Sequence, residues 1–357
     1  MAYCFSGVAE DLLGVLKIFI SKSYFSEADY NRALKRHTYA SFEASDKPEP
    51  IDVKKRKLRG KAFSILCHIR NVGFYFDFIN PNIEIYGEES FELLRMLSSI
   101  VEVVMAPVVR KYEIAMFEEE VIHYLNLRKK IYEQYPSLIN KPKPKTHYLS
   151  HYGESFIMYG PSVGVCTSRY ESKHRTAKML ATSSKNFVNI AKTLARRQQY
   201  RQSSVYYNGM FDTDEIHLPA DVKRKEDLED SPKGSSFHKI FEFMDDDSIL
   251  SNEVMFRNQM YRQEDVVVLK VLNKDHMYIG VIKGVLLKQD VLYFLVSCYE
   301  VVRDLNLRYF VTVDRTSTNF SFVTSSRLAD YKPLIKHGTS SKFKVTLHHH
   351  ISNPMTD

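Results

Sequence analysis

Apolar residues in the N-terminal part of the chain recur at steps of three and four, the spacing that places side chains on one face of an α-helix. This pattern predicts two helices within residues 1–35, an apolar segment at 63–78, and further helices at 88–106 and 116–135. Ser26 is the expected N-cap of the second helix. The N-terminal part is therefore predicted to be mainly helical.

The hydrophobic period changes to two after residue 235, where runs of β-branched and aromatic residues begin. The predicted strands cover residues 266–272, 277–285, 291–299, 309–313, 320–323 and 343–348. Short polar turns at 273–275 and 288–290 are the expected tight hairpins. Such strands predict a small antiparallel β-barrel of SH3-like size. The predicted fold class is α+β, with a mainly helical N-terminal region followed by this barrel.

An acidic segment separates the two patterns. Between residues 212 and 230 there are eight acidic and three basic side chains, and a Ser-Pro-Lys-Gly-Ser-Ser run follows. This composition favours a disordered tether. The predicted division is a helical domain at 1–202, a linker at 203–235, a β-barrel domain at 236–351 and a short tail at 352–357.

The composition, with 44% hydrophobic residues among 357, suffices for one large core or two modest ones. Four dispersed cysteines without a CxxC pair indicate a reducing compartment. No apolar run reaches the roughly 18 residues that a membrane span needs. Glu10 and Asp11 precede the apolar run at 12–20, where a signal peptide would carry basic residues. We therefore expect an intracellular protein, nuclear or cytoplasmic, with no membrane partner.

Positive charge is concentrated in residues 141–201, which hold twelve basic and two acidic side chains, a net charge of +10 against +7 for the whole chain. A helical pattern begins near residue 168, and if the chain breaks at Ser183 and Ser184 it forms two helices. The residues predicted to contact a polyanion are Arg175, Lys178, Lys185, Lys192, Arg196 and Arg197. A one-sided basic helix suits the phosphates of DNA. A solvated basic face has the same pattern.

Other segments also have two interpretations. Residues 54–61, KKRKLRGK, are typical of a polyanion-binding or nuclear-localisation segment and equally of a solvated basic loop. His147 and His151 are spaced for one helix face, and residues 348–350 are a histidine run, but no further ligand completes a metal set. The sequence has no glycine-rich phosphate loop, HExxH, GxSxG or paired-cysteine motif. We expect no metal and no cofactor.

Residues 143–199 resemble a segment of the CACTA (En/Spm-like) transposases with the pattern PK-H-L-HY, GP, R-E-KH, K, NF-N and LA-R-Q. The matching residues are Pro144, His147, Tyr152, Gly160, Pro161, Arg169, Glu171, Lys173, His174, Lys178, Asn186, Phe187 and Leu194. VAEDLLGVLKIFI, KLRGKAFSILCHIRNVGF and EVVMAPV precede this segment in the matching order. YIGVIKGVLL, YFLVSCYE and LADYKPL resemble the tail that accompanies it. The resemblance spans nearly the whole chain through diffuse motifs.

The resemblance implies descent from a ribonuclease-H-like DNA transposase, in which three carboxylates hold two divalent metal ions that activate water on a phosphodiester. It places the two aspartates upstream of this chain, and the family's Asp-x-x-His corresponds to Gly7 and Glu10. Glu171 is the one matching position for the third carboxylate, and a charge at a helix start also explains it. One carboxylate cannot build a two-metal site, so we expect no catalytic activity.

The expected function is that of a non-catalytic remnant or domesticated fragment of a DNA transposase, which contacts double-stranded DNA without sequence preference through its basic helix. The alternative is a protein–protein interaction module whose β-barrel binds a partner chain, with the basic helix contributing only solubility. A third interpretation is an active nuclease that uses Glu171.

Overall fold

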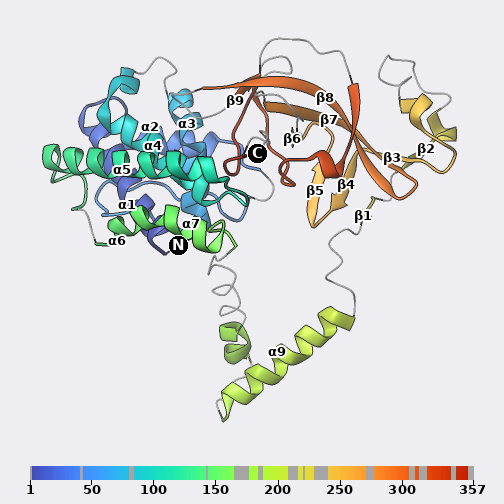
Figure 1. Cartoon of the computed structure of the whole chain (residues 1–357), viewed down its shortest axis with the longest axis horizontal. Helices are drawn as coiled ribbons and strands as arrows, with labels where there is room; N and C mark the ends of the chain where they lie inside the picture. The colour runs from blue at the N-terminus through green and yellow to red at the C-terminus, as the bar shows by residue number, and fades with distance from the viewer. Residues whose placement is uncertain are drawn as a thin grey trace.

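The protein consists of a helical unit, a β unit and a helical arm that projects from the body, so that the fold class is α+β (Figure 1). The structure is a computed structural model that describes residues 2–40, 43–79, 84–141, 144–164, 177–183, 188–207, 216–219, 222–228, 240–270, 277–304, 310–312, 320–338 and 343–352. None of the helices within these ranges is long and apolar enough to span a membrane.

The helical unit confirms the pattern predicted for the N-terminal part. Its elements are α1 (Ala2–Ser21), α2 (Glu27–Arg36), α3 (Ala62–Ile79), η2 (Glu84–Gly87), α4 (Glu89–Val104), α5 (Lys111–Gln134), α6 (Pro144–His147), η3 (Tyr148–His151) and α7 (Tyr152–Tyr159). The helix α2 begins at the predicted N-cap, where the Ser26 hydroxyl accepts a hydrogen bond from the Asp29 backbone N–H. The Asp29 carboxylate accepts from the Ser26 backbone N–H in return, which completes a capping box.

The core of the helical unit is formed mainly by α1, α3, α4 and α5. The helix α3 carries apolar side chains on all of its faces, and it is therefore buried over most of its length. Phe19 of α1 and Phe76 of α3 pack with ring centroids 5.9 Å apart. The Arg128 guanidinium of α5 donates two hydrogen bonds of 2.8 and 2.7 Å to the Asp11 carboxylate of α1, and both side chains are buried. Tyr124 donates a third, so this polar group fixes α5 against α1.

The β unit contains all six predicted strands, which correspond to β6 through β10 and β12. The strands are β1 (Ile216–His217), β2 (Lys223–Arg224), β3 (Ile249–Ser251), β4 (Glu253–Phe256), β5 (Gln259–Arg262), β6 (Val266–Leu269), β7 (Met277–Lys288), β8 (Val291–Arg303), β9 (Phe310–Thr312), β10 (Phe320–Thr324), β11 (His337–Gly338) and β12 (Phe343–Val345), with η4 (Glu226–Leu228) and η5 (Ser325–Arg327) between them. The strands β1 to β5 and β11, each of two to four residues, were not predicted from the sequence.

The predicted closed β-barrel is wrong, because the sheets are open. One antiparallel sheet has the order β11-β12-β9-β8-β7-β3-β2, with β10 also pairing with β8 and β6 with β7, and a second sheet has the order β1-β4-β5. Closure would require the two end strands to pair with a consistent stagger, whereas β11 and β2 lie at opposite ends of the order. The strands β7 and β8 have 12 and 13 residues, long enough to pair with different neighbours along their length.

The turn between β7 and β8 confirms the hairpin predicted at 288–290. Lys288 pairs with Val291, and the two residues between them, Gln289 and Asp290, have φ angles of 49° and 61°. Positive φ at both positions is the geometry of a two-residue turn that follows the twist of the strands. The hairpin predicted at 273–275 lies outside the described residues.

The β unit packs against the helical unit through its C-terminal strands. Lys344 of β12 forms an ion pair of 2.7 Å with Asp77 of α3. At the C-terminal cap of α2, His37 stacks on His337 of β11 with ring centroids 4.8 Å apart. Within the predicted linker at 203–235, the described residues form the end of the arm, β1, β2 and η4. The division into domains stays a prediction.

Candidate functional site

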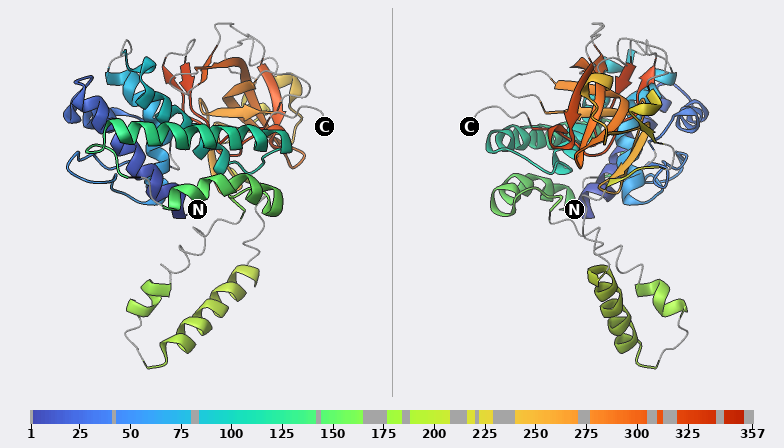
Figure 2. Two further views of the ribbon diagram at one scale, coloured as in Figure 1. Left: turned by 60° about the vertical axis from the view of Figure 1, so that its left-hand side comes forward. Right: turned by 90° about the vertical axis from the view of Figure 1, so that its right-hand side faces the viewer.

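The arm consists of a helical segment at residues 177–183 and the helix α9 (Ile190–Tyr207). Both stand away from the body in the views of Figures 1 and 2. The predicted helical pattern is confirmed as two helices, and Asn189 between them has a φ of 57°. Ser184, at the expected break between the two helices, lies outside the described residues. Because α9 contains neither glycine nor proline, its 18 residues continue without a break.

The side chains of the arm do not enter a hydrophobic core. Every side chain described between residues 177 and 207 is half-buried or exposed. Among the apolar side chains of the arm, Ala177, Leu180 and Leu194 are half-buried and Ala191 is exposed, so they cover no core. Three tyrosines of α9 are exposed: Tyr200, Tyr206 and Tyr207 are 68%, 72% and 92% exposed. Exposed aromatic rings beside cations are typical of surfaces that bind single-stranded nucleic acids, whose unpaired bases stack on the rings.

The predicted DNA-contacting residues on the described arm are all exposed cations. They are Lys178, Lys192, Arg196 and Arg197, and Arg201 adds a fifth. Within the part of the chain that the structure describes, none of the five forms an ion pair. The segment from 177 to 207 also contains no acidic residue. Within this segment, the positive charge is therefore not balanced by any acidic side chain.

The spacing of these cations on α9 gives the arm a broad basic surface. Lys192, Arg196 and Tyr200 follow at steps of four, which places them on one face of the helix. Arg197 and Arg201, again four apart, lie on the neighbouring face. At 3.6 residues per turn the four cations cover about half of the circumference. A helix of this length extends for about 27 Å, which corresponds to roughly eight base pairs of a duplex.

Two residues of the predicted site, Arg175 and Lys185, lie outside the described residues, as does Glu171. His147 and His151 contact each other, with their Nε2 atoms 3.2 Å apart, as expected of packed histidines. In the described part of the chain, no group of three or more histidine, cysteine, aspartate and glutamate side chains is placed to hold a metal ion.

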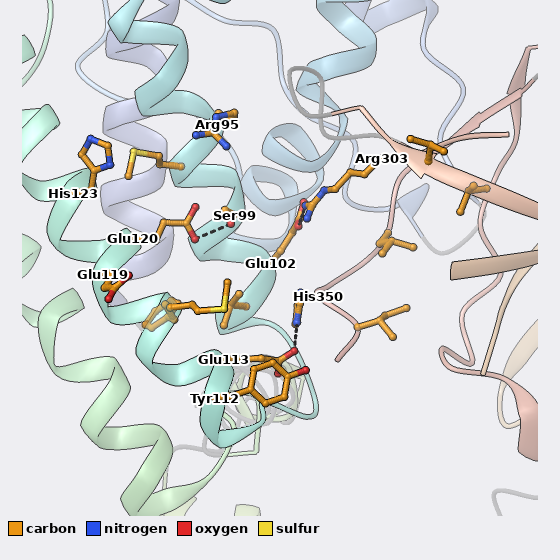
Figure 3. A pocket seen from close by; sticks show the side chains of 18 residues that line it. Arg95, Ser99, Glu102, Tyr112, Glu113, Glu119, Glu120, His123, Arg303 and His350 are labelled. Carbon is orange, nitrogen blue, oxygen red and sulfur yellow. Dashed lines mark hydrogen bonds and ion pairs between the residues drawn. The ribbon is translucent and has the colours of Figure 1, made fainter. Parts of the chain in front are cut away.

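A pocket of about 870 Å³ lies where the helical and β units meet, between α4, α5, β8 and the C-terminal segment (Figure 3). Two ion pairs at this pocket connect the units. Arg303 of β8 donates to Glu102 of α4 at 2.7 Å, and His350 lies 2.8 Å from Glu113 of α5. Burial acts to raise the pKa of Glu113, but hydrogen bonds from the Arg110 backbone, His350 and Ser352 outweigh it, so the pKa lies below its usual value.

No motif or periodicity in the sequence indicates this pocket. Its lining residues come from segments as distant as Arg95 and Ile351, which only the packing of the two units brings together. Two apolar side chains that line the pocket, Met116 and Val302, are 67% and 58% exposed. The exposed apolar side chains suit the binding of a partner or ligand. The charged groups of the pocket mainly hold the helical and β units together.

No protein-family model, curated protein or solved structure matches this chain. The resemblance to CACTA transposases therefore stays a prediction.

Proposed function

We propose that this protein binds double-stranded DNA without sequence preference through α9 and the adjoining helical segment. The observation that supports this most is the projecting, uncompensated positive charge of Lys192, Arg196, Arg197 and Arg201. A free α-helix can enter the major groove of DNA, and cations along it release counterions from the phosphates. Contacts to phosphates carry no sequence information, so the binding is nonspecific.

The proposal includes an origin. The protein is a non-catalytic remnant or domesticated fragment of a CACTA-type transposase, nuclear or cytoplasmic, and a DNA ligand favours the nucleus. The support is the order of the matching residues in 143–199, among which Lys178 and Leu194 belong to the arm. Because only Glu171 matches one of the three carboxylates, we propose no catalytic step.

A second candidate is a protein–protein interaction module. The pocket between the helical and β units supports it, because exposed Met116 and Val302 offer apolar area beside paired charges. Such a partner would bind with little dependence on salt.

The test is a titration of a labelled duplex of random sequence at several salt concentrations. A variant with Lys192, Arg196, Arg197 and Arg201 changed to Gln keeps helix propensity and removes four charges from α9. Each phosphate contact contributes about −0.9 to the slope of log K against log salt, so this variant should flatten the slope by up to about 3.6.

The matched control changes four exposed lysines elsewhere, on α2, α5 and β2, to Gln. They are Lys35, Lys111, Lys129 and Lys223. The control has the same net charge as the α9 variant, so it measures the general effect of charge. Equal binding by the two variants would contradict the proposed function of α9.

A further inference from the structure

We propose that the turn at residues 54–59, here called the basic turn, is a second phosphate-binding surface that contacts the same DNA duplex as α9. This inference rests on the proposed function and extends it to the body of the protein. Its five cations, Lys54, Lys55, Arg56, Lys57 and Arg59, are all exposed. None of them forms an ion pair with the residues that the structure describes.

The backbone of the basic turn is held by the helical unit. The Leu58 N–H donates to the carbonyl of Ala9 in α1 at 3.0 Å, and the Leu58 side chain is buried. The Asn140 amide donates to the Arg56 carbonyl at 2.8 Å, and the Lys17 ammonium donates to the Lys55 carbonyl at 2.6 Å.

These contacts have a direct consequence for binding. The main-chain groups face the body and the cationic side chains face solvent, so the turn presents its charge without having to fold when a ligand arrives. Less conformational entropy of the protein is lost when a ligand binds such a preorganised surface.

This anchoring decides between the interpretations of the basic run. A nuclear-localisation segment that binds in a receptor groove has to be extended, and its main-chain groups have to be free to bond to the receptor. Here carbonyls of the run are already bound and Leu58 is part of the core. A phosphate backbone needs only the side chains, so it can dock on the turn as it stands.

The position of the basic turn agrees with a shared duplex. The N-terminus of α1 lies beside α7 in Figures 1 and 2, and the arm follows α7 in the chain. Ala9 lies in the first half of α1, and Asn140 precedes α6, which contacts α1. The turn therefore lies along α1, between Ala9 and Lys17, beside the segment that leads through α6 and α7 to the arm.

The chemistry of the turn favours DNA over a membrane surface. Peripheral membrane segments insert large apolar side chains between their cations. Residues 50–61 expose none, because Ile51 and Leu58 are buried and Val53 is half-buried.

The experiment compares four forms of the full chain with the wild type. In the turn variant, Lys54, Lys55, Arg56 and Lys57 are changed to Gln. The others are the α9 variant, the combined variant and the four-lysine control defined above. Affinity is measured by fluorescence anisotropy on duplexes of about 40 and about 10 base pairs. The shorter duplex is about 34 Å long, which is too short to contact α9 and the basic turn at the same time. Circular dichroism checks that each variant is folded.

On the long duplex, the turn variant should bind roughly tenfold or more weakly than the control and show a flatter salt dependence. The combined variant should bind more weakly than either parent. On the short duplex, the effect of the turn variant should be smaller. Equal affinities of the turn variant and the control on the long duplex would overturn this inference and leave the proposal for α9 intact.

Two other results are informative. If the α9 variant binds like the control while the turn variant is weakened, the proposed function of α9 fails and DNA contact by the body remains. Vesicles with about 30% phosphatidylserine provide the membrane comparison. Charge-dependent binding to them, without any effect of the turn variant on duplex affinity, would overturn DNA as the ligand of this surface.

Discussion

At the scale of single residues, this protein uses charge in two opposite ways. Asp11 and Arg128 are buried and joined by two hydrogen bonds, since a charge removed from water needs a partner. The cations of α9 are exposed and keep their hydration, so they gain little from internal pairing. This difference separates the residues that stabilise the fold from those available to a ligand.

The buried pair gives the first prediction at this scale. The substitution Asp11→Asn leaves the Arg128 guanidinium buried without a counter-charge, so the free energy of unfolding should fall by about 3–5 kcal/mol. Urea denaturation measures this change. Glu89→Gln, which breaks the exposed pair with Lys130, is the control and should cost less than about 1 kcal/mol. Equal losses in the two variants would contradict the role assigned to Asp11.

The stacked histidines between the units give a second prediction. The pKa of His37 and that of His337 are both lowered to about 4, mainly by burial and for His37 also by the charge of His337, while Glu43 acts to raise both. In the unfolded chain both have the ordinary pKa of 6.5. The unfolded chain therefore binds protons first as the pH falls, so the stability present above pH 6.5 is lost progressively towards pH 4.

The variant His337→Phe keeps a ring against His37 and removes one of the two titrating groups. Its thermal midpoint should fall less than that of the wild type between about pH 7 and about pH 4.5. His123→Gln, which changes an exposed histidine of α5, should behave like the wild type. If His337→Phe loses stability as steeply as the wild type, protonation of this pair does not control the contact between the units.

At the scale of elements, the hairpin of β7 and β8 organises the β unit. β8 pairs with β7, β9 and β10, and β7 also pairs with β3 and β6. The register of the main sheet therefore depends on the two-residue turn that joins them. That turn holds Gln289 and Asp290 at positive φ without a glycine.

The turn gives the prediction at this scale. The double substitution Gln289→Asn and Asp290→Gly introduces residues that adopt positive φ more readily, so it should stabilise the protein by about 1 kcal/mol. Gln289→Val, which places a β-branched side chain at positive φ, is the opposite test and should destabilise it. Urea midpoints of the three proteins measure both effects. A destabilised Asn-Gly variant would show that the turn does not limit the stability of the hairpin.

At the scale of the whole molecule, the chain consists of a packed body and a projecting arm. The helical and β units share an interface with ion pairs such as Lys344 with Asp77 and Arg303 with Glu102. The arm, in contrast, has no buried side chain among those described. Retention of such an arm is consistent with a role in binding rather than in folding.

Replacement of residues 177–207 by a flexible Gly/Ser linker tests this division. Because the described side chains of the arm bury no apolar surface in the core, the thermal midpoint of the body should change by less than about 4 °C. DNA affinity should fall and its salt dependence should flatten, as is also expected of the α9 variant. A large loss of stability would show that the arm is part of the folded core.

The sequence by itself determined the features that depend on near neighbours. Helical spacing located α1 to α5, the side-chain chemistry of Ser26 set the start of α2, and alternating β-branched residues located β7 and β8. The basic character of the arm was also evident, because a count of charges needs no fold. These predictions succeeded because they rest on periodicity and on interactions within a few residues.

The tertiary structure alone decided the rest. It placed β2 and β11 at opposite ends of an open sheet rather than side by side in a barrel. It left α9 outside the body and anchored the basic turn through Ala9 and Asn140. It also formed the pocket between segments far apart in the chain. Each of these features depends on contacts between residues distant in sequence, and local propensity and composition contain no information about which distant residues will meet.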